Sequence, residues 1–358
     1  MADNKENKVL NVPALRFPEF TEEWNYESLD TIAPNITSGR SKPSLGEYNL
    51  YGSTGIIGKT ATADYSGDML LVARVGANAG SLQLVNDSCG ITDNTLIIKP
   101  CKLSSHYLYF YLQHYNLNRL VFGSGQPLIT AGMLKKVRIP FGNQLEQKKI
   151  ENFLCCIDER ITTQNKIIED LKKLKSALYQ EMFGSLVAQT LKLGQVAEVV
   201  KGKQVNGTEL LEQGDYYVMN GGTLPSGWLY KYNTEANTIS ISEGGNSCGY
   251  VQYNTSPYWS GGHCYSLKIL HPQETSDLYL YHFLKWQEEN IMALRIGSGL
   301  PNIQKKDLLH FPVILPTITQ QNKIVLILSA IEEKVSCEIS ITQYFVKQKE
   351  YLLSQLFI

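Results

Sequence analysis

Apolar positions follow a heptad pattern in two long segments, Gln144–Phe183 and Ile318–Phe357, which contain neither glycine nor proline. Spacings of four and three are typical of helices that bury one stripe against a partner helix. At a rise of 1.5 Å per residue, 40 residues reach about 60 Å, which is longer than the core of one domain. We expect two long helices that pair through these positions: Ile150, Leu154, Ile157, Ile161, Leu171, Leu178, Ile324, Leu328, Ile331, Val335, Phe345 and Leu352.

The second half of the chain repeats the first. The element Gly123–Ile129 returns as Gly297–Ile303, at an offset of 174 that holds without a gap to the end of the second helical segment. Upstream, Arg74–Gly80 matches Glu243–Gly249 at an offset of 169. Because internal repeats indicate repeated structural units, we expect two equivalent halves, each about 160–170 residues long.

Each half begins with a segment rich in glycine, tyrosine, asparagine and serine, in which short apolar runs alternate with turn residues. Such runs are typical of β-strands. They are Met69–Ala73, Thr95–Ile98, Thr238–Ile241 and Tyr265–Ile269. A helical pattern then follows, at Ser105–Tyr115 in the first half and at Asp277–Ala293 in the second.

The predicted fold is α+β: two β-rich globular domains joined by two antiparallel coiled-coil helices in a pseudo-twofold dumb-bell. The antiparallel sense is expected because only a short connection follows Phe183 before the second domain begins. Two independent core helices are the alternative. The expected boundaries are a leader of residues 1–25, a first domain of 26–143, a first helix of 144–183, a second domain of 184–317 and a second helix of 318–358.

Composition narrows the class of protein. Hydrophobic residues make up 43% and charged residues 19% of the 358 positions, and no apolar run approaches the roughly 20 residues of a membrane-spanning helix. The polar start and seven scattered cysteines without a C-x-x-C pair predict a soluble cytoplasmic protein with no disulfide framework. With a net charge of −1, any nucleic-acid surface must be a local patch.

Motifs for common catalytic chemistry are incomplete. Gly52–Thr60 ends in Gly-Lys-Thr, but Ser53 stands where a phosphate-binding loop needs glycine. Asn254–Trp259 resembles the motif with which amino-methyltransferases grip an amine, but Thr255 and Ser256 break it. The six histidines lack metal-binding spacing. We therefore expect no catalytic residue and no metal site.

Several elements resemble specificity (S) subunits of type I restriction–modification systems. They are the leader Asn11–Trp24, the repeated Gly-Ser-Gly-x-Pro-x-Ile element, the helix starts Gln144–Ile150 and Ile318–Ile324, and the helix end Leu171–Phe183. The resemblance covers nearly the whole chain. The second helix departs from it, because Thr317 and Thr319 replace a proline-rich start that contains glutamate.

The resemblance implies a non-catalytic subunit with two target-recognition domains, each of which reads one half of a split sequence in double-stranded DNA. It implies that the helices set the spacer and dock two modification subunits, which carry S-adenosylmethionine and methylate adenine. Restriction motor–nuclease subunits, which use ATP and Mg²⁺, would join for cleavage. This chain itself would need no cofactor.

DNA readout requires polar side chains on loops that reach base edges or phosphates. We consider Arg74 the strongest candidate, because Gly76 and Gly80 would let its backbone approach a duplex. The candidates are Arg40, Lys42, Arg74, Asn78 and Gln126 in the first half, and Lys201, Lys203, Gln204, Asn220, Asn246, Arg295 and Asn302 in the second. Each could instead be a solvated loop residue.

Two other functions remain open on the sequence alone. Duplicated β-rich domains on a coiled coil could form an adaptor that binds protein or carbohydrate rather than DNA. A methyltransferase in its own right would have to bind S-adenosylmethionine as an isolated chain. Salt-dependent retention on duplex DNA distinguishes the adaptor from a DNA reader.

Overall fold

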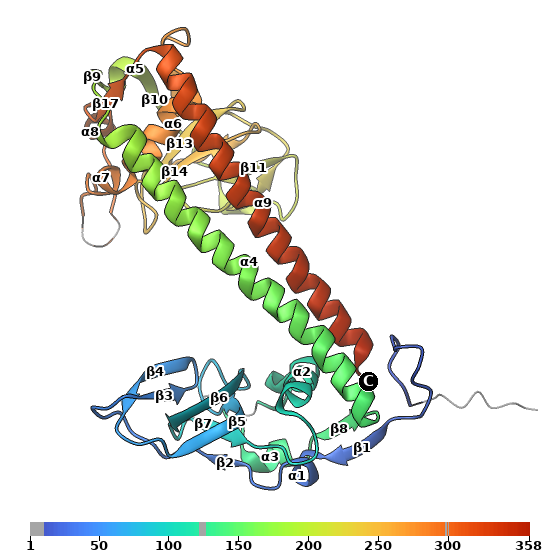
Figure 1. Cartoon of the computed structure of the whole chain (residues 1–358). Coiled ribbons are helices and arrows are strands. Elements are labelled where there is room, and N and C mark those ends of the chain that lie inside the picture. Colours follow the sequence, from blue (N-terminus) through green and yellow to red (C-terminus); the bar gives the residue numbers. More distant parts are fainter. Residues whose placement is uncertain (1–10, 122–126, 298, 300) are drawn as a thin grey trace, which may run out of the picture. The chain divides into compact units, whose positions relative to one another are not determined.

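The computed structural model describes residues 11–121, 127–297, 299 and 301–358 (Figure 1). The chain divides into two compact units. Unit 1 comprises the chain up to Asn165 together with Ser340–Ile358, and unit 2 is Lys166–Ile339. The long helices α4 (Gln144–Gly184) and α9 (Ile318–Leu356) therefore each contribute one segment to both units.

Unit 1 is built on a six-stranded sheet with the order β2-β7-β5-β6-β3-β4 (Figure 1). Its strands are β2 (Thr37–Ser38), β3 (Tyr48–Gly52), β4 (Gly55–Thr60), β5 (Tyr65–Ala73), β6 (Leu82–Ile91) and β7 (Thr95–Ile98). A separate antiparallel pair joins β1 (Asn25–Ser28) to β8 (Arg138–Phe141). The helices are α1 (Leu29–Ile32), α2 (Ser105–Tyr115), the 3₁₀ turn Leu117–Leu120 and α3 (Ala131–Lys135).

Unit 2 has a four-stranded sheet with the order β10-β16-β13-β14 and a three-stranded sheet with the order β12-β11-β15. Their strands are β10 (Ala197–Lys201), β11 (Tyr216–Met219), β12 (Trp228–Leu229), β13 (Thr238–Ser242), β14 (Val251–Asn254), β15 (Trp259–Ser260) and β16 (Cys264–Ile269). The pair β9 (Gln189–Lys192) with β17 (Pro312–Leu315) matches β1 with β8. All four predicted strands are confirmed, since they lie within β5, β7, β13 and β16.

The helices of unit 2 are α5 (Leu193–Val196), the 3₁₀ turn Gly207–Glu209, α6 (Asp277–Trp286), α7 (Glu288–Met292) and α8 (Lys305–Leu309). The helical stretch expected over Asp277–Ala293 is confirmed, but it consists of two helices that are separated at Gln287. The Glu288 carboxylate accepts hydrogen bonds from Val251 N at 2.8 Å and Lys285 Nζ at 2.6 Å. Glu288 is thereby bonded to β14, a contact between distant residues that the local pattern of apolar residues does not predict.

Segments of the two long helices pack against each other within each unit. In unit 1, Lys349 Nζ lies 2.6 Å from Asp158 Oδ1, and the Arg160 guanidinium lies 5.7 Å from the Phe345 ring centroid. A step forward along α4 thus corresponds to a step backward along α9, so the segments are antiparallel. In unit 2 the equivalent ion pair joins Lys175 to Glu332 at 2.6 Å.

The expected seam residues vary in burial. Four are in the core of unit 1 and two in that of unit 2: Ile150, Leu154, Ile157 and Leu352, and Ile324 and Leu328. Ile331 is also buried. The remaining five are half-buried: Ile161, Leu171, Leu178, Val335 and Phe345.

The C-terminal end of each long helix packs in the core of the domain that belongs to the other repeat. Phe357, at the end of the second repeat, packs in unit 1 with its ring centroid 5.5 Å from Tyr107 and 5.9 Å from His114. Phe183, the equivalent residue of the first repeat, packs in unit 2 at 5.8 Å from Tyr279 and 5.3 Å from Trp286. Both domains are therefore completed by a helix from the other half of the sequence.

The leader is anchored in unit 1 by one buried carboxylate. Glu146, in the first turn of α4, accepts hydrogen bonds from Arg16 at 2.6 and 2.8 Å and from Trp24 Nε1 at 3.0 Å. Leu15 N donates to Gln355 O at 2.9 Å, which also ties the leader to α9. The equivalent of Glu146 in the second repeat is Gln320, which is exposed, so this anchor belongs to the first repeat alone.

Candidate nucleic-acid interface

A glycine-rich turn has the same backbone in both units. In unit 1, Gly76 N donates to Pro127 O at 3.1 Å and Gly80 N to Ala73 O at 2.9 Å. The equivalent bonds of unit 2 run from Gly245 N to Pro301 O at 3.0 Å and from Gly249 N to Ser242 O at 2.8 Å. Arg74–Gly80 and Glu243–Gly249 are therefore the same structural element.

The turn requires glycine at two positions. The backbone angle φ is +78° at Gly76 and +79° at Gly245, and it is +93° at Gly80 and +92° at Gly249. Residues other than glycine rarely adopt these φ values, because a Cβ atom would clash with the backbone. The two turns thus hold a common backbone, while the residue at the first position differs: Arg74 in unit 1 and Glu243 in unit 2.

In unit 1 the turn lies beside the loop after β2. Gly39 N donates to Thr95 O at 3.0 Å and Arg74 N to Asn94 O at 2.9 Å, so Arg40 and Arg74 follow strands on the two sides of β7. Arg40, Lys42 and Asn78 are exposed, and Arg74 is half-buried. Gln126 lies outside the described residues.

In unit 2 the turn gathers three candidates. Lys201 Nζ lies 2.7 Å from Glu243 Oε1. Asn302 forms a β-bridge with Gly244 in the turn. Asn220 Oδ1 accepts from His263 N at 3.1 Å, and the carbonyl of His263 accepts from Glu243 N at 2.9 Å.

Four further candidates of unit 2 lie around this group and are exposed: Lys203, Gln204, Asn246 and Arg295. Lys203 N donates to Ser260 O at 2.8 Å, at the end of β15. A Cβ placed on Gly262 would lie 2.2 Å from Gln204 Oε1, so this glycine permits the close approach. Burial raises the pKa of the Cys248 thiol in the turn, and Arg295 opposes that rise.

Glu243 and Tyr265 were missed as candidates from the sequence. The Tyr265 hydroxyl lies 2.9 Å from Glu243 Oε1 and 3.1 Å from Ile303 O. Burial, and then the hydrogen bond to Glu243, hold the pKa of Tyr265 well above its usual range, so its hydroxyl stays protonated and can donate. The match of Arg74 to Glu243 was the available signal, but a carboxylate was not expected at a DNA-reading position.

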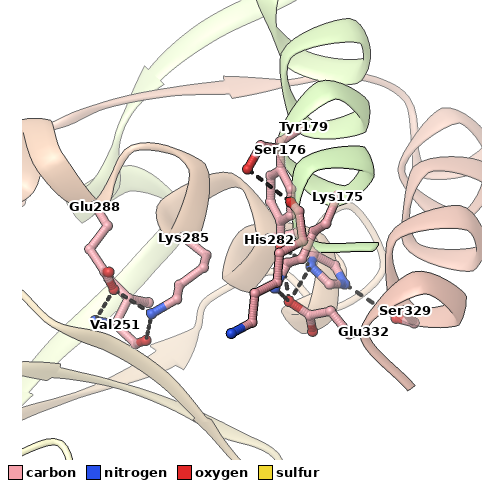
Figure 2. Close-up of polar contacts among 10 residues, drawn as sticks. Lys175, Ser176, Tyr179, Val251, His282, Lys285, Glu288, Ser329 and Glu332 are labelled. Carbon is pink, nitrogen blue, oxygen red and sulfur yellow. Dashed lines mark hydrogen bonds and ion pairs between the residues drawn. The ribbon is translucent and has the colours of Figure 1, made fainter. Parts of the chain in front are cut away.

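A polar network lies elsewhere in unit 2, where α6 meets α4 and α9 (Figure 2). His282 Nδ1 lies 2.8 Å from the Tyr179 hydroxyl, and Nε2 lies 3.2 Å from Ser329 Oγ. Tyr179 donates to Glu332 Oε1 at 3.1 Å, and Lys175 pairs with the same oxygen. Burial lowers the pKa of His282 to about 4. Neutral His282 with its proton on Nδ1 has a hydrogen-bond partner at both ring nitrogens: Nδ1–H donates to the Tyr179 oxygen, and Ser329 Oγ donates to Nε2.

This network joins α6 to α4 and α9 within unit 2. The equivalent positions of unit 1 are apolar: Phe110 for His282, Leu353 for Tyr179 and Cys155 for Ser329. Within the described ranges, no group of three or more histidine, cysteine, aspartate or glutamate side chains could hold a metal ion. The described helices include none with the length and apolarity to cross a membrane.

Comparison with known proteins places the chain in a family. Residues 9–173 and 188–343 both match the type I restriction modification DNA specificity domain. A type I specificity subunit of Mycoplasma pneumoniae is 36% identical over 144 residues, which are 40% of this chain and 38% of that protein. One of Mycoplasma genitalium is 28% identical over 252 residues, covering 65% of this chain and 66% of its own length. The chain thus spans less than two thirds of these relatives.

Solved structures share the fold. The crystal structure of a type I restriction–modification S subunit from M. genitalium aligns with a TM-score of 0.74 at 21% identity, over 97% of this chain and 99% of that one. A chain from a study of type I complex assembly and conformational transition aligns with a TM-score of 0.56 at 16% identity, over 93% and 97%. The two family matches cover most of the sequence, and the protein therefore belongs to the family of type I restriction–modification DNA specificity domains, of which it contains two copies.

Proposed function

We propose that this chain is the specificity subunit of a type I restriction–modification system and that each β-rich domain reads one half of a split target in double-stranded DNA. The observation that carries the proposal is the pair of glycine-rich turns with one backbone and different side chains, Arg74 and Glu243. A shared backbone would dock both domains on DNA in the same way. Different side chains would read different bases.

We further propose a pseudo-twofold dumb-bell in which α4 and α9 form an antiparallel coiled coil and set the distance between the half-sites. The repeated ion pairs Lys349–Asp158 and Lys175–Glu332 support this arrangement, because each joins a helix of one repeat to a helix of the other. Readers built from two equivalent domains recognise half-sites at a separation fixed by geometry.

The long helices would also dock two modification subunits. Each unit exposes two apolar side chains that are equivalent under the repeat: Phe153 and Ile341 in unit 1, and Ile327 and Ile167 in unit 2. Their exposed fractions are 40%, 37%, 41% and 39%, respectively. Because the same pair of apolar positions is exposed once in each unit, the two pairs would suit two copies of one partner. Restriction motor–nuclease subunits would complete the assembly.

Catalysis would reside in these partners. In this proposal the modification subunits bind S-adenosylmethionine, the restriction subunits use ATP and Mg²⁺, and the present chain binds no cofactor. The assembly would act in the cytoplasm, where the DNA that it reads is located.

Sequencing of genomic DNA for methylated adenines, with and without this gene, tests the proposal. We expect a split methylated motif that disappears with the gene. A duplicated adaptor for protein or carbohydrate would leave the methylation pattern unchanged. It would also show no salt-dependent retention on duplex DNA, whereas a DNA reader loses affinity as salt rises.

A further inference from the structure

A row of three paired residues crosses the sheet of unit 2 next to the glycine-rich turn. Lys201 of β10 pairs with Tyr265 of β16, and Tyr265 pairs with Ile241 of β13. The chain passes from β13 into the turn at Glu243. Lys201, Tyr265 and Glu243 therefore meet at one end of this sheet.

The corresponding row of unit 1 is made of Ser38, Leu96 and Val72. Ser38 of β2 pairs with Leu96 of β7, and Leu96 pairs with Val72 of β5. The chain then enters the turn at Arg74. Ser38 and Leu96 thus take the places of Lys201 and Tyr265, while Arg74 takes the place of Glu243.

The three residues at these positions contact one another in unit 2 but not in unit 1. In unit 2, Glu243 Oε1 lies 2.7 Å from Lys201 Nζ and 2.9 Å from the Tyr265 hydroxyl. In unit 1, Leu96 is buried and its side chain offers no hydrogen bond, and Ser38 is short and uncharged. Arg74 has no ion pair or side-chain hydrogen bond to any described residue. Arg74 thus supplies a cation from the turn in unit 1, and Lys201 supplies one from the strand beside the turn in unit 2.

Exposure separates the roles of the two charged residues in unit 2. The Lys201 side chain is 55% exposed and that of Glu243 is 12% exposed. Glu243 Oε2 is buried without a hydrogen-bond partner among the described residues. An ammonium has three donors, so Lys201 keeps two for a ligand after it has bound Glu243.

We propose that Lys201 is the base-reading counterpart of Arg74 in the second domain and that Glu243 and Tyr265 position it. This inference rests on the proposed DNA-reading function. The recognised group is an acceptor atom on a base edge, such as guanine O6 or N7. Glu243 neutralises the charge that would attract any phosphate and directs the remaining donors of Lys201, so the pair favours base readout over phosphate binding.

The experiment selects randomised DNA duplexes with the full-length chain and measures affinity for non-specific duplex at several salt concentrations. Glu243→Gln keeps an oxygen acceptor for Lys201 but removes the negative charge. We expect preference to fall about tenfold at one position of one half-site, as for loss of a base contact. Because Lys201 is then free to bind phosphate, non-specific affinity should rise and its salt slope should steepen by about one unit.

Two further variants separate this role from simple charge or folding effects. Glu212→Gln makes the same charge change at an exposed residue and should keep every base preference. Lys201→Gln combined with Glu243→Gln restores neutrality and should lose preference at the same position without the steeper salt slope. A misfolded domain would lose preference throughout its half-site, so a loss confined to one position, together with the gain in non-specific affinity, reports on positioning.

The outcomes distinguish the inference from the function on which it rests. A wild-type chain that selects no split sequence would overturn both. A wild-type chain that selects a split sequence, together with a Glu243→Gln variant that keeps its preference at all positions, would overturn only the assignment of Lys201 and Glu243.

Discussion

Replacement of His282 by phenylalanine should make unit 2 less sensitive to acid. His282 has 1% of its side chain exposed, and burial lowers its pKa from the ordinary value of 6.5 to about 4. Glu332 opposes this shift and Lys175 adds to it. Phenylalanine occupies the equivalent position of unit 1, at Phe110, so the side chain suits this site in the fold.

The expected magnitude follows from proton linkage. Between pH 6.5 and about 4, unfolded His282 is protonated and folded His282 is neutral, so the unfolded state binds more protons. The free energy of unfolding therefore rises with pH across this window. The stability that neutral His282 contributes is lost as the pH falls from 6.5 to about 4. At 1.36 kcal/mol for each unit of pKa difference, His282 alone accounts for roughly 3 kcal/mol.

Urea unfolding at a series of pH values from 7 to 4, followed by tryptophan fluorescence, measures the effect. Trp286 is half-buried, packs against the core of unit 2 at Phe183 and reports on this region. The wild-type protein should lose about 3 kcal/mol more than His282→Phe across the window. His271→Phe, at an exposed histidine, is the control and should follow the wild type. Parallel pH profiles for the wild type and His282→Phe would refute the reasoning.

Three further predictions concern DNA reading and stability. Arg74→Ala should cost about 1–3 kcal/mol of discrimination within one half-site, measured by duplex selection; an even loss of affinity with a shallower salt slope would instead assign Arg74 to phosphate. Insertion of four helix-forming residues after both Asn165 and Ile339 adds about 6 Å and about 40° beyond a full turn. Because this rotation is close to that of one base pair, the methylated motif should widen by one pair, and an unchanged gap would contradict a helical ruler. Phe357→Ala should reduce the free energy of unfolding by about 3–5 kcal/mol, because Phe357 is buried between the leader and α2, and a loss below 1 kcal/mol in urea unfolding would contradict that packing role.

Some features of this protein follow from local sequence. The heptads of Gln144–Phe183 and Ile318–Phe357 are sufficient to predict two long helices, because the spacing of apolar residues reports directly on helical periodicity. The repeat at an offset of 174 predicts equivalent parts, because similar segments fold alike. Glycine at positions 76, 80, 245 and 249 marks the turn, since the backbone there adopts positive φ.

Other features depend on contacts between distant residues. Glu288, at the start of α7, accepts a hydrogen bond from Val251 N, across 37 positions. The Lys201–Glu243 pair spans 42 positions and forms only because β16 lies between β10 and β13. A residue-by-residue reading therefore selected Lys201 and overlooked Glu243, whose role depends on its partner.

Helix pairing shows the same division between sequence and tertiary structure. Periodicity shows that α4 and α9 each have an apolar stripe, but Phe357 completes the core of the first domain, and Phe183 that of the second, only after the antiparallel segments meet. The sequence by itself determined the elements and their duplication, because these depend on residues within a few turns of one another. Tertiary structure decided which charges meet and which helix completes which core, because burial and hydrogen bonding act between groups that are close in space and far apart along the chain.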